Sequence, residues 1–298
     1  MRLSNLKKNP FREIWDHPLY NNAYNHNLPG YPLLVDVELT NKCNIICLFC
    51  DRQIMEREQG LMSEELFRKI VDDISKNSPF LKAIKFSRWG EPSLHPEFYK
   101  FIRIAKEKGL KIHVTSNGLL LNPEKCLNID SLNISMQGLN KEEYTKIRNN
   151  DQYDRLVDNI MQIMAMEERP FVNLSVTVLD ETEEEINEFK EKWLTLVDAI
   201  GFGQTSFVRV DNQEMLKRQT WEGRAKPCND VLTRLSVDWD GCITPCCADF
   251  DRHLMIGNIK DNTIKELWTN KRITEIREIM KNGEWEKMKF CQTCSHRW

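Results

Sequence analysis

Residues 33–50 read LLVDVELTNKCNIICLFC, an apolar run followed directly by a loop that carries three cysteines. The apolar run follows the chain breakers Pro29-Gly30 and Pro32, and it predicts a buried strand. The loop therefore begins where this strand ends. In parallel sheets, loops at the carboxyl ends of the strands form the functional site. The fold and the first candidate site are thus both indicated by these 18 residues.

Strand and helix patterns alternate along the chain after this stretch. Apolar runs that predict further strands lie at 83–86, 111–115, 131–135, 171–179 and about 200–210. Helical spacing of apolar residues begins after Ser63, a typical N-cap, and recurs at 97–108, 153–166 and 183–197. Such alternation predicts an α/β fold with a parallel sheet covered by helices. We expect about six strand-helix units in residues 33–212.

The pattern changes after Asn212. Two apolar runs at 234–238 and 242–244 flank Trp239-Asp240-Gly241, which predicts a hairpin with an Asp-Gly turn. A helix is predicted from about Thr263 to Met280. Six of the ten cysteines lie beyond residue 212. We therefore expect an irregular or short-helical arm at 1–32, a main domain at 33–212 and a small cysteine-bearing domain at 213–298.

Composition limits the classes of function. The chain has 298 residues, of which 41% are hydrophobic and 29% charged, and this is the composition of a globular protein. A net charge of -3 without a basic stripe argues against a nucleic-acid partner. No apolar stretch near the cysteines approaches the length of a membrane span, and the N-terminus lacks a signal-peptide core. We expect a cytoplasmic protein without a membrane partner, in which cysteines are metal ligands more often than disulfides.

Three thiolates at Cys43, Cys47 and Cys50 can hold three corners of a 4Fe-4S cube and leave one iron open for another ligand. Zinc with a fourth ligand from elsewhere suits the same loop. Buried thiols without a metal are a third interpretation. The spacing alone leaves the cluster and zinc comparable.

A second set of cysteines lies in the C-terminal stretch. Cys228, Cys246, Cys291 and Cys294 can close another four-iron site, although paired thiolates also suit a structural zinc ribbon. Cys247 is an alternative ligand to its neighbour Cys246, or a free thiol near a substrate. In the second case we assign Cys247 a catalytic role, as a donor of a hydrogen atom.

The first cysteine loop resembles the signature of the radical S-adenosylmethionine (SAM) superfamily, in which three cysteines follow the first strand and an aromatic residue precedes the last of them. This resemblance implies a partial (β/α)6 barrel, a 4Fe-4S cluster with an open iron, and SAM bound to that iron. Phe49 would then lie close to the adenine of SAM.

Further short motifs resemble the family in the same order along the chain. Gly90-Glu91-Pro92 resembles its Gly-Gly-Glu-Pro motif, and Gly90 and Glu91 would accept the amino group of SAM, although Trp89 replaces the first glycine. Ser116 and Asn117 resemble its ribose-side motif. The last two positions that resemble cofactor contacts of the family are Ser135 and Arg148.

The C-terminal pattern resembles the SPASM/twitch extension of radical SAM enzymes. Because the sequence ends four residues past Cys294, we expect the shorter, twitch-like form with one auxiliary 4Fe-4S cluster, which makes two clusters in all. The resemblance implies an oxidoreductase in which hydrogen is abstracted from a small-molecule substrate. A sugar or aminocyclitol would be oxidised with the auxiliary cluster as electron acceptor, and the electron donor would be a flavodoxin or ferredoxin.

Three other functions stay open at the level of sequence. An epimerase would return a hydrogen atom from a cysteine to the substrate radical. A peptide-modifying SPASM maturase would act with a separate recognition protein, because the 32 residues before the first strand are too short for a leader-peptide domain. The third is an iron-sulfur or zinc-binding module without turnover.

Overall fold

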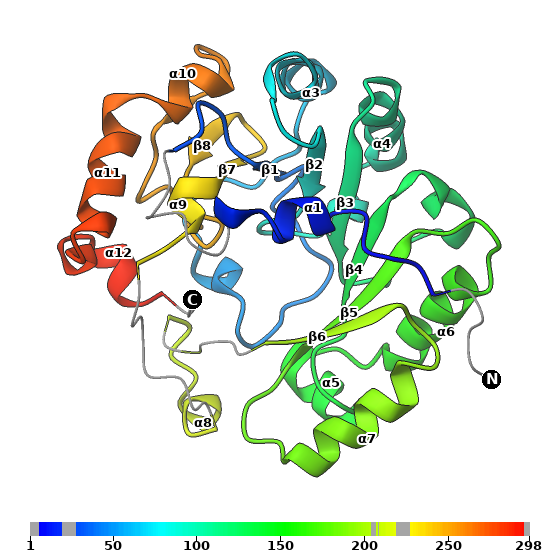
Figure 1. The fold of residues 1–298 in the computed structure, drawn as a ribbon. Coiled ribbons are helices and arrows are strands. Elements are labelled where there is room, and N and C mark those ends of the chain that lie inside the picture. Colours follow the sequence, from blue (N-terminus) through cyan, green and yellow to red (C-terminus); the bar gives the residue numbers. More distant parts are fainter. Residues whose placement is uncertain (1–5, 20–27, 204–206, 208, 219–226, 295–298) are drawn as a thin grey trace.

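The computed structural model describes residues 6–19, 28–203, 207, 209–218 and 227–294. Within these residues one sheet has the strand order β6-β5-β4-β3-β2-β1-β7-β8-β9 (Figure 1). All neighbours from β6 to β7 pair in parallel, whereas β8 and β9 are antiparallel additions. The strands are β1 (Leu34–Val37), β2 (Ala83–Phe86), β3 (Lys111–Ser116), β4 (Ser131–Ser135), β5 (Phe171–Thr177), β6 (Ala199–Gly203), β7 (Arg234–Val237), β8 (Cys242–Thr244) and β9 (Gly257–Asn258).

Helices connect the parallel strands and cover their outer face. The α-helices are α1 (Arg12–Trp15), α3 (Glu64–Asn77), α4 (Phe98–Glu107), α5 (Lys141–Arg148), α6 (Tyr153–Met164), α7 (Glu183–Trp193), α8 (Gln213–Leu216), α9 (Asp230–Thr233), α10 (Ile264–Trp268), α11 (Lys271–Lys281) and α12 (Lys289–Gln292). Short 3₁₀ helices are η2 (Asp51–Ile54), η3 (Pro92–Leu94), η4 (Pro123–Asn128) and η5 (Trp285–Lys287). The sequence-based prediction of a partial (β/α)6 barrel is confirmed, except that η4 takes the place of an α-helix between β3 and β4.

Helix α3 illustrates how the sequence builds this outer layer. The hydroxyl of Ser63 accepts a hydrogen bond from the backbone N–H of Leu66, so the predicted N-cap is confirmed. The apolar side of α3 is buried, and its Phe67 stacks on Phe101 of α4 with ring centroids 4.4 Å apart. Burial of such an aromatic side chain stabilises the fold by about 1.5–3 kcal/mol.

The inner face of the sheet is polar. Along β2 to β5 most of the fully buried residues are apolar and pack in the core with α3, α4 and α6, whereas alternate residues are only partly buried. The buried polar residues Ser116, Ser131 and Thr177 stand at the ends of their strands. Because strand side chains alternate between faces, these alternate residues point to the barrel interior. Lys85 and His113 face each other in register across β2 and β3, and Asn133 and Asn173 across β4 and β5.

The amino ends of β1 and β2 are covered by the N-terminal arm. Phe11 and Ile14 pack on Leu34 and Ala83, the first residues of these two strands. The ring of Phe11 also contacts His113, with centroids 5.5 Å apart. The arm therefore lies at the end of the barrel opposite the cysteine loop.

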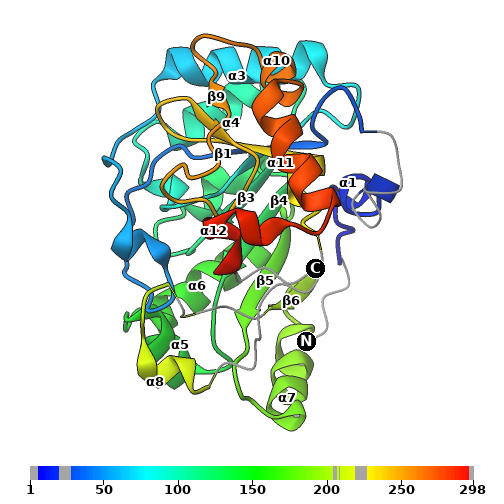
Figure 2. The same cartoon turned by 90° about the vertical axis from the view of Figure 1, so that its left-hand side faces the viewer.

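The C-terminal region continues the main sheet. The predicted hairpin is confirmed, because β7 and β8 pair antiparallel and Gly241 adopts a φ of 92° in the turn. Sequence reasoning did not predict that β7 pairs in parallel with β1 over four residues. Figure 1 shows α10, α11 and α12 on the side of the molecule where β7 and β8 lie, away from β6, and in Figure 2 these helices face the viewer.

Two sequence-based boundaries were wrong. The helix predicted from Thr263 to Met280 is two helices, because Asn270 caps α11 by accepting from the backbone N–H of Ile273. The sixth strand ends at Gly203, well before the predicted residue 210.

No helix among the described residues combines the length and the apolar character that crossing a membrane requires. The division into residues 1–32, 33–212 and 213–298 stays a prediction.

Candidate functional site

The first cysteine loop is held in place by hydrogen bonds to its backbone. Gln53 Nε2 donates to the carbonyl oxygen of Cys47 at 2.7 Å, and Arg52 Nη2 donates to that of Ile45 at 3.2 Å. The N–H of Leu48 bonds the carbonyl oxygen of Ile147 in α5 at 2.9 Å. These hydrogen bonds fix the path of the loop backbone.

The thiols of this loop are shielded from water. Burial raises the pKa of Cys43, and it raises the pKa of Cys50 to about 12. Both shifts also include repulsion from the neighbouring Cys47. A metal that binds here must therefore displace protons from these thiols.

Glu91 joins two loops at the carboxyl ends of β2 and β3. One carboxylate oxygen accepts from the N–H of Ser93 at 3.1 Å, its hydroxyl at 2.6 Å and the hydroxyl of Ser116 at 2.8 Å. The other oxygen accepts from the N–H of Asn117 at 2.6 Å. Asn117 in turn donates to Asn44 of the cysteine loop at 2.8 Å. Glu91, only 2% exposed, therefore organises the groups around it.

Gly90 is where the β2 loop touches the start of the cysteine loop. Its φ is 130°, and a Cβ at this position would lie 2.3 Å from the carbonyl oxygen of Thr40 and 2.8 Å from Cα of Asn41. Those neighbours are backbone atoms of the segment that leads to Cys43, so they cannot move aside cheaply. Only glycine permits this approach.

These loops surround one cavity of about 190 Å³. The structure brings together here all ten residues that the sequence assigned to the first cluster and to SAM, namely Cys43, Cys47, Phe49, Cys50, Gly90, Glu91, Ser116, Asn117, Ser135 and Arg148. Phe49 packs edge-on against Phe207, with ring centroids 6.3 Å apart. Their roles as ligands stay a prediction that this shared location supports.

Two buried hydrogen-bond donors at the cavity indicate whether SAM fits there. Arg148 Nε and Trp89 Nε1 have no hydrogen-bond partner within the residues that the structure describes. Buried donors are costly unless an acceptor reaches them, and the carboxylate and hydroxyl oxygens of SAM are acceptors. Cys47 is buried and Cys43 and Cys50 are half-buried beside the same cavity, and three such thiols suit an iron-sulfur cluster. The donor set therefore fits both groups.

The second cysteine set is buried in the C-terminal region. Its members are between 4% and 9% exposed, namely Cys228, Cys246, Cys291 and Cys294. Burial raises the pKa of Cys246 well above its ordinary value, and neighbouring charges at Cys247, Cys228 and Cys294 add to this shift. Two other members of the set are thus close to Cys246.

Cys247 points elsewhere. Its thiol donates to Asp230 Oδ2 at 3.3 Å, and charges at Arg234 and Asp36 act on it as well. The structure therefore favours Cys246 over Cys247 as the ligand of the second set. The catalytic role assigned to Cys247 stays a prediction.

No three His, Cys, Asp or Glu side chains in the described part of the chain converge as ligands of a single metal ion do. In a four-iron cube each cysteine binds its own iron, so the fit of the two cysteine sets does not depend on such convergence.

Sequence reasoning missed two arginines at this site. Arg88 follows β2, and Arg209 donates to Asp51, beside Cys50, at 2.8 Å and to the carbonyl oxygen of Phe290 at 3.3 Å. The Arg209 guanidinium also lies 4.1 Å from the centre of the Phe290 ring. Arg88 begins the stretch Arg88-Trp89-Gly90-Glu91-Pro92, but the family resemblance gives it no role, and Arg209 belongs to no recognised motif. Only the contacts between distant segments identify the two side chains.

Known proteins are similar to this chain over most of its length. A cofactor-modifying protein for tungsten-containing aldehyde ferredoxin oxidoreductase from Pyrococcus furiosus is 26% identical, over 88% of this chain and 86% of its own. An S-adenosyl-L-methionine-dependent 2-deoxy-scyllo-inosamine dehydrogenase from Niallia circulans is 23% identical, over 88% and 92%.

Solved structures share the fold at low identity. BtrN in complex with AdoMet and 2-DOIA superimposes with a TM-score of 0.56 at 17% identity, over 89% of this chain and 93% of its own. The enzyme anSMEcpe with bound AdoMet gives 0.67 at 17% identity, over 88% and 84%.

Family models assign both parts of the chain. The model of the radical SAM superfamily matches residues 37–192, more than half of the sequence. The SPASM model, an iron-sulfur cluster-binding domain, matches residues 228–295. SAM and iron-sulfur clusters are accordingly the cofactors. From its matched residues, its fold and its cysteine-lined cavity, this chain belongs to the radical SAM superfamily and carries a C-terminal SPASM domain.

Proposed function

We propose that this chain is an oxidoreductase that abstracts hydrogen from a small hydroxylated substrate, a sugar or an aminocyclitol, and oxidises it. The observation that carries this proposal is the polar inner face of the sheet. Lys85, Thr115, Asn133 and Asn173 point into the barrel from four neighbouring strands. Thr115 also lines the cavity of the first cysteine loop.

These side chains suit hydroxyl and amino groups. Asn173 donates to Asn133 Oδ1 at 2.6 Å, which leaves each carboxamide with further capacity to donate and accept. Lys85 Nζ lies 3.5 Å from Asp36 Oδ1, and that carboxylate is fully buried. A polyhydroxylated ring finds donors and acceptors on several sides here, whereas an apolar substrate would leave them unpaired.

The dehydrogenase relative supports the same class of substrate. This relative is a dehydrogenase of 2-deoxy-scyllo-inosamine, and the similarity extends over 92% of its length. At 23% identity it supports the class of substrate and of reaction.

When bound, SAM and the first cluster supply a 5'-deoxyadenosyl radical, which takes one hydrogen atom from a C–H bond. In the proposed oxidation a carbinol carbon then loses the hydroxyl proton and one electron to become a ketone. We propose that the auxiliary cluster of the SPASM domain accepts this electron. A flavodoxin or ferredoxin supplies the electron that starts the cycle. The protein's part is to orient the substrate and to exclude water.

An epimerase is the second candidate, and the position of Cys247 favours it. Burial raises the pKa of this thiol above its usual range, so it keeps its hydrogen at neutral pH. Its sulfur lies among Asp230, Arg234 and Asp36, and Asp36 belongs to the inner face of β1. In this second candidate, the thiol would return a hydrogen atom to a substrate radical.

A substrate screen that reads both 5'-deoxyadenosine and product mass tests the proposal. We expect a sugar or aminocyclitol product that is two hydrogens lighter, whereas an epimerase gives an unchanged mass. In a folded variant with Cys291→Ser and Cys294→Ser, 5'-deoxyadenosine should still form while the oxidised product is lost. Circular dichroism must accompany the assay, because a domain closed by metal thiolates can unfold without its metal.

Two results would overturn these assignments. Normal ketone formation by the Cys291 and Cys294 variant refutes the auxiliary cluster as electron acceptor. Replacement of Cys247 by alanine should leave oxidation largely intact, and loss of an epimeric product in that variant establishes the second candidate instead.

A further inference from the structure

Arg88 connects the cofactor cavity to the auxiliary cysteine set. It lines the cavity beside Trp89 and Gly90, and its side chain is 0% exposed. Nη1 donates to the carbonyl oxygen of Cys246 at 2.7 Å. Nη2 donates to the carbonyl oxygen of Asp249 at 3.0 Å. One buried side chain therefore spans two parts of the chain about 160 residues apart.

The backbone at Arg88 is strained to achieve this. Its φ is 98°, a conformation that side-chain-bearing residues rarely adopt. Such strain persists only where surrounding contacts hold the residue in place. The three hydrogen bonds of the guanidinium to the C-terminal region are the contacts that do so.

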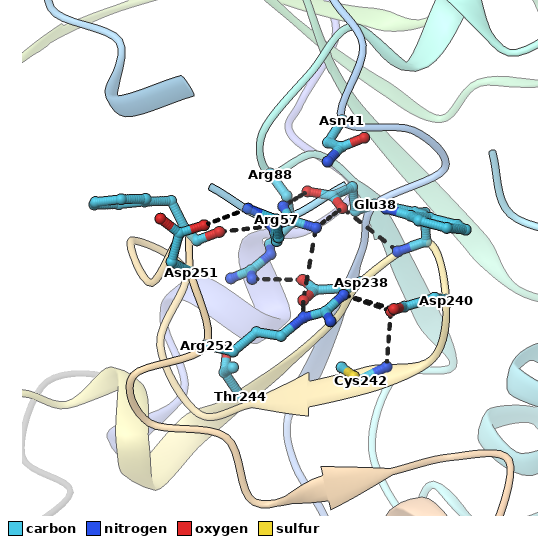
Figure 3. A network of polar contacts seen from close by, with 12 residues as sticks. Glu38, Asn41, Arg57, Arg88, Asp238, Asp240, Cys242, Thr244, Asp251 and Arg252 are labelled. Atoms are coloured by element: carbon cyan, nitrogen blue, oxygen red, sulfur yellow. Dashed lines mark hydrogen bonds and ion pairs between the residues drawn. The ribbon is translucent and has the colours of Figure 1, made fainter. Parts of the chain in front are cut away.

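Arg88 keeps its charge in this buried position. Burial lowers its pKa, but the carboxylates of Asp238 and Glu38 outweigh burial and raise the pKa above the usual range. Asp238 Oδ1 accepts from Nη2 at 2.7 Å. Figure 3 shows this contact within a larger network that also contains Arg57 and Arg252.

We propose that Arg88 is a positioning residue that holds Cys246 against the cofactor-site loop, and that its buried charge raises the reduction potential of the auxiliary cluster. A positive charge stabilises the reduced cluster, which is more negative by one unit. The inference deepens the proposed function, because a higher potential favours the electron transfer that completes the oxidation.

The test is the midpoint potential of each cluster in Arg88→Gln, followed by electron paramagnetic resonance during a redox titration. A unit charge at about 10 Å in a medium of dielectric constant about 20 changes an equilibrium constant by roughly tenfold. We expect the equilibrium constant for reduction of the auxiliary cluster to fall at least tenfold. For one electron this is a shift of about 59 mV to more negative potential. The potential of the first cluster should shift less than that of the auxiliary cluster, because the guanidinium donates to the backbone of Cys246.

Arg252→Gln is the matched control. Arg252 donates to Asp238 at 2.9 Å and to Asp240 at 2.7 Å, so it belongs to the same ion-pair network. Its side chain is 23% exposed, and none of its hydrogen bonds is to Cys246. We expect less than half the shift of Arg88→Gln. Equal shifts in the two variants, or an unchanged potential in Arg88→Gln, would overturn the proposal.

Asp238→Asn decides the matter if Arg88→Gln does not assemble the auxiliary cluster. This substitution removes the negative charge that lies beside the Arg88 guanidinium but leaves its hydrogen bonds to Cys246 and Asp249 in place. The potential of the auxiliary cluster should therefore rise. An unchanged or lower potential refutes the electrostatic role. These titrations need no substrate, so they separate this inference from the proposed function. Failure of the proposed function would appear instead as absent oxidised product with both potentials as expected.

Discussion

Glu91→Gln is the substitution for which the structure gives the clearest expectation. The carboxylate accepts four hydrogen bonds from the N–H and hydroxyl of Ser93, the hydroxyl of Ser116 and the N–H of Asn117. A glutamine keeps one oxygen but replaces the other by an amide that can only donate. Because two of the four partners are backbone N–H groups, some donors must then face each other or lose their acceptor.

The magnitude follows from these bonds. A buried hydrogen bond to a charged group contributes about 1.5–3 kcal/mol, and an unsatisfied buried donor costs about 1–3 kcal/mol. With rotation of the hydroxyls offsetting part of the loss, we expect the free energy of unfolding to fall by about 2–4 kcal/mol. Asn117 and the β2 loop should lose their fixed positions as well, so the affinity for SAM should fall at least tenfold.

The assay combines urea unfolding with calorimetric titration of SAM, on protein whose iron content shows that both clusters are assembled. Glu97→Gln is the control, because Glu97 pairs with Lys100 on the surface and exposed pairs contribute about 0–1 kcal/mol. If Glu91→Gln keeps both the stability and the SAM affinity of the wild type, Glu91 does not organise the site.

Three further predictions concern the metal, the pH dependence and the glycine contact. Chemical analysis of reconstituted protein should find close to eight irons, and alanine at all three cysteines of the first loop should halve that number. Zinc bound by the second cysteine set would contradict the prediction of two four-iron clusters. Burial, with the charges of Lys85 and Arg234, lowers the pKa of His113 to about 3. The unfolded chain binds a proton at this histidine below about pH 6.5, whereas the folded protein does not, so the free energy of unfolding falls as pH decreases. His113→Gln should reduce the stability loss between pH 6.5 and 5 by about 2 kcal/mol in urea unfolding, and an unchanged loss would refute the shift. Gly90→Ala should lower the free energy of unfolding by about 2–4 kcal/mol in the same assay. At Gly30 a Cβ meets nothing within 4 Å, so Gly30→Ala should not lower it, and equal effects of the two substitutions would contradict the contact argument.

Local sequence determined the parallel half of the sheet. Alternation of apolar and polar residues placed β2 and β4 at their observed bounds, because side chains on one face of a strand must be buried together. The N-cap at Ser63 could also be predicted from the sequence, since capping depends on residues three apart. The helix break at Asn270 was missed, because apolar spacing continues across it and the cap interrupts only the backbone.

The sequence by itself also located ten of the residues that line the cofactor cavity, because most of them follow a strand within short motifs that resemble the family. Tertiary structure alone decided the link between the two cysteine sets. The pairing of β7 with β1 brings the C-terminal region against the β2 loop, so that Arg88 reaches Cys246 and Cys247 turns toward Asp230. No local pattern encodes these contacts, because they join segments far apart in the chain whose meeting depends on the sheet between them.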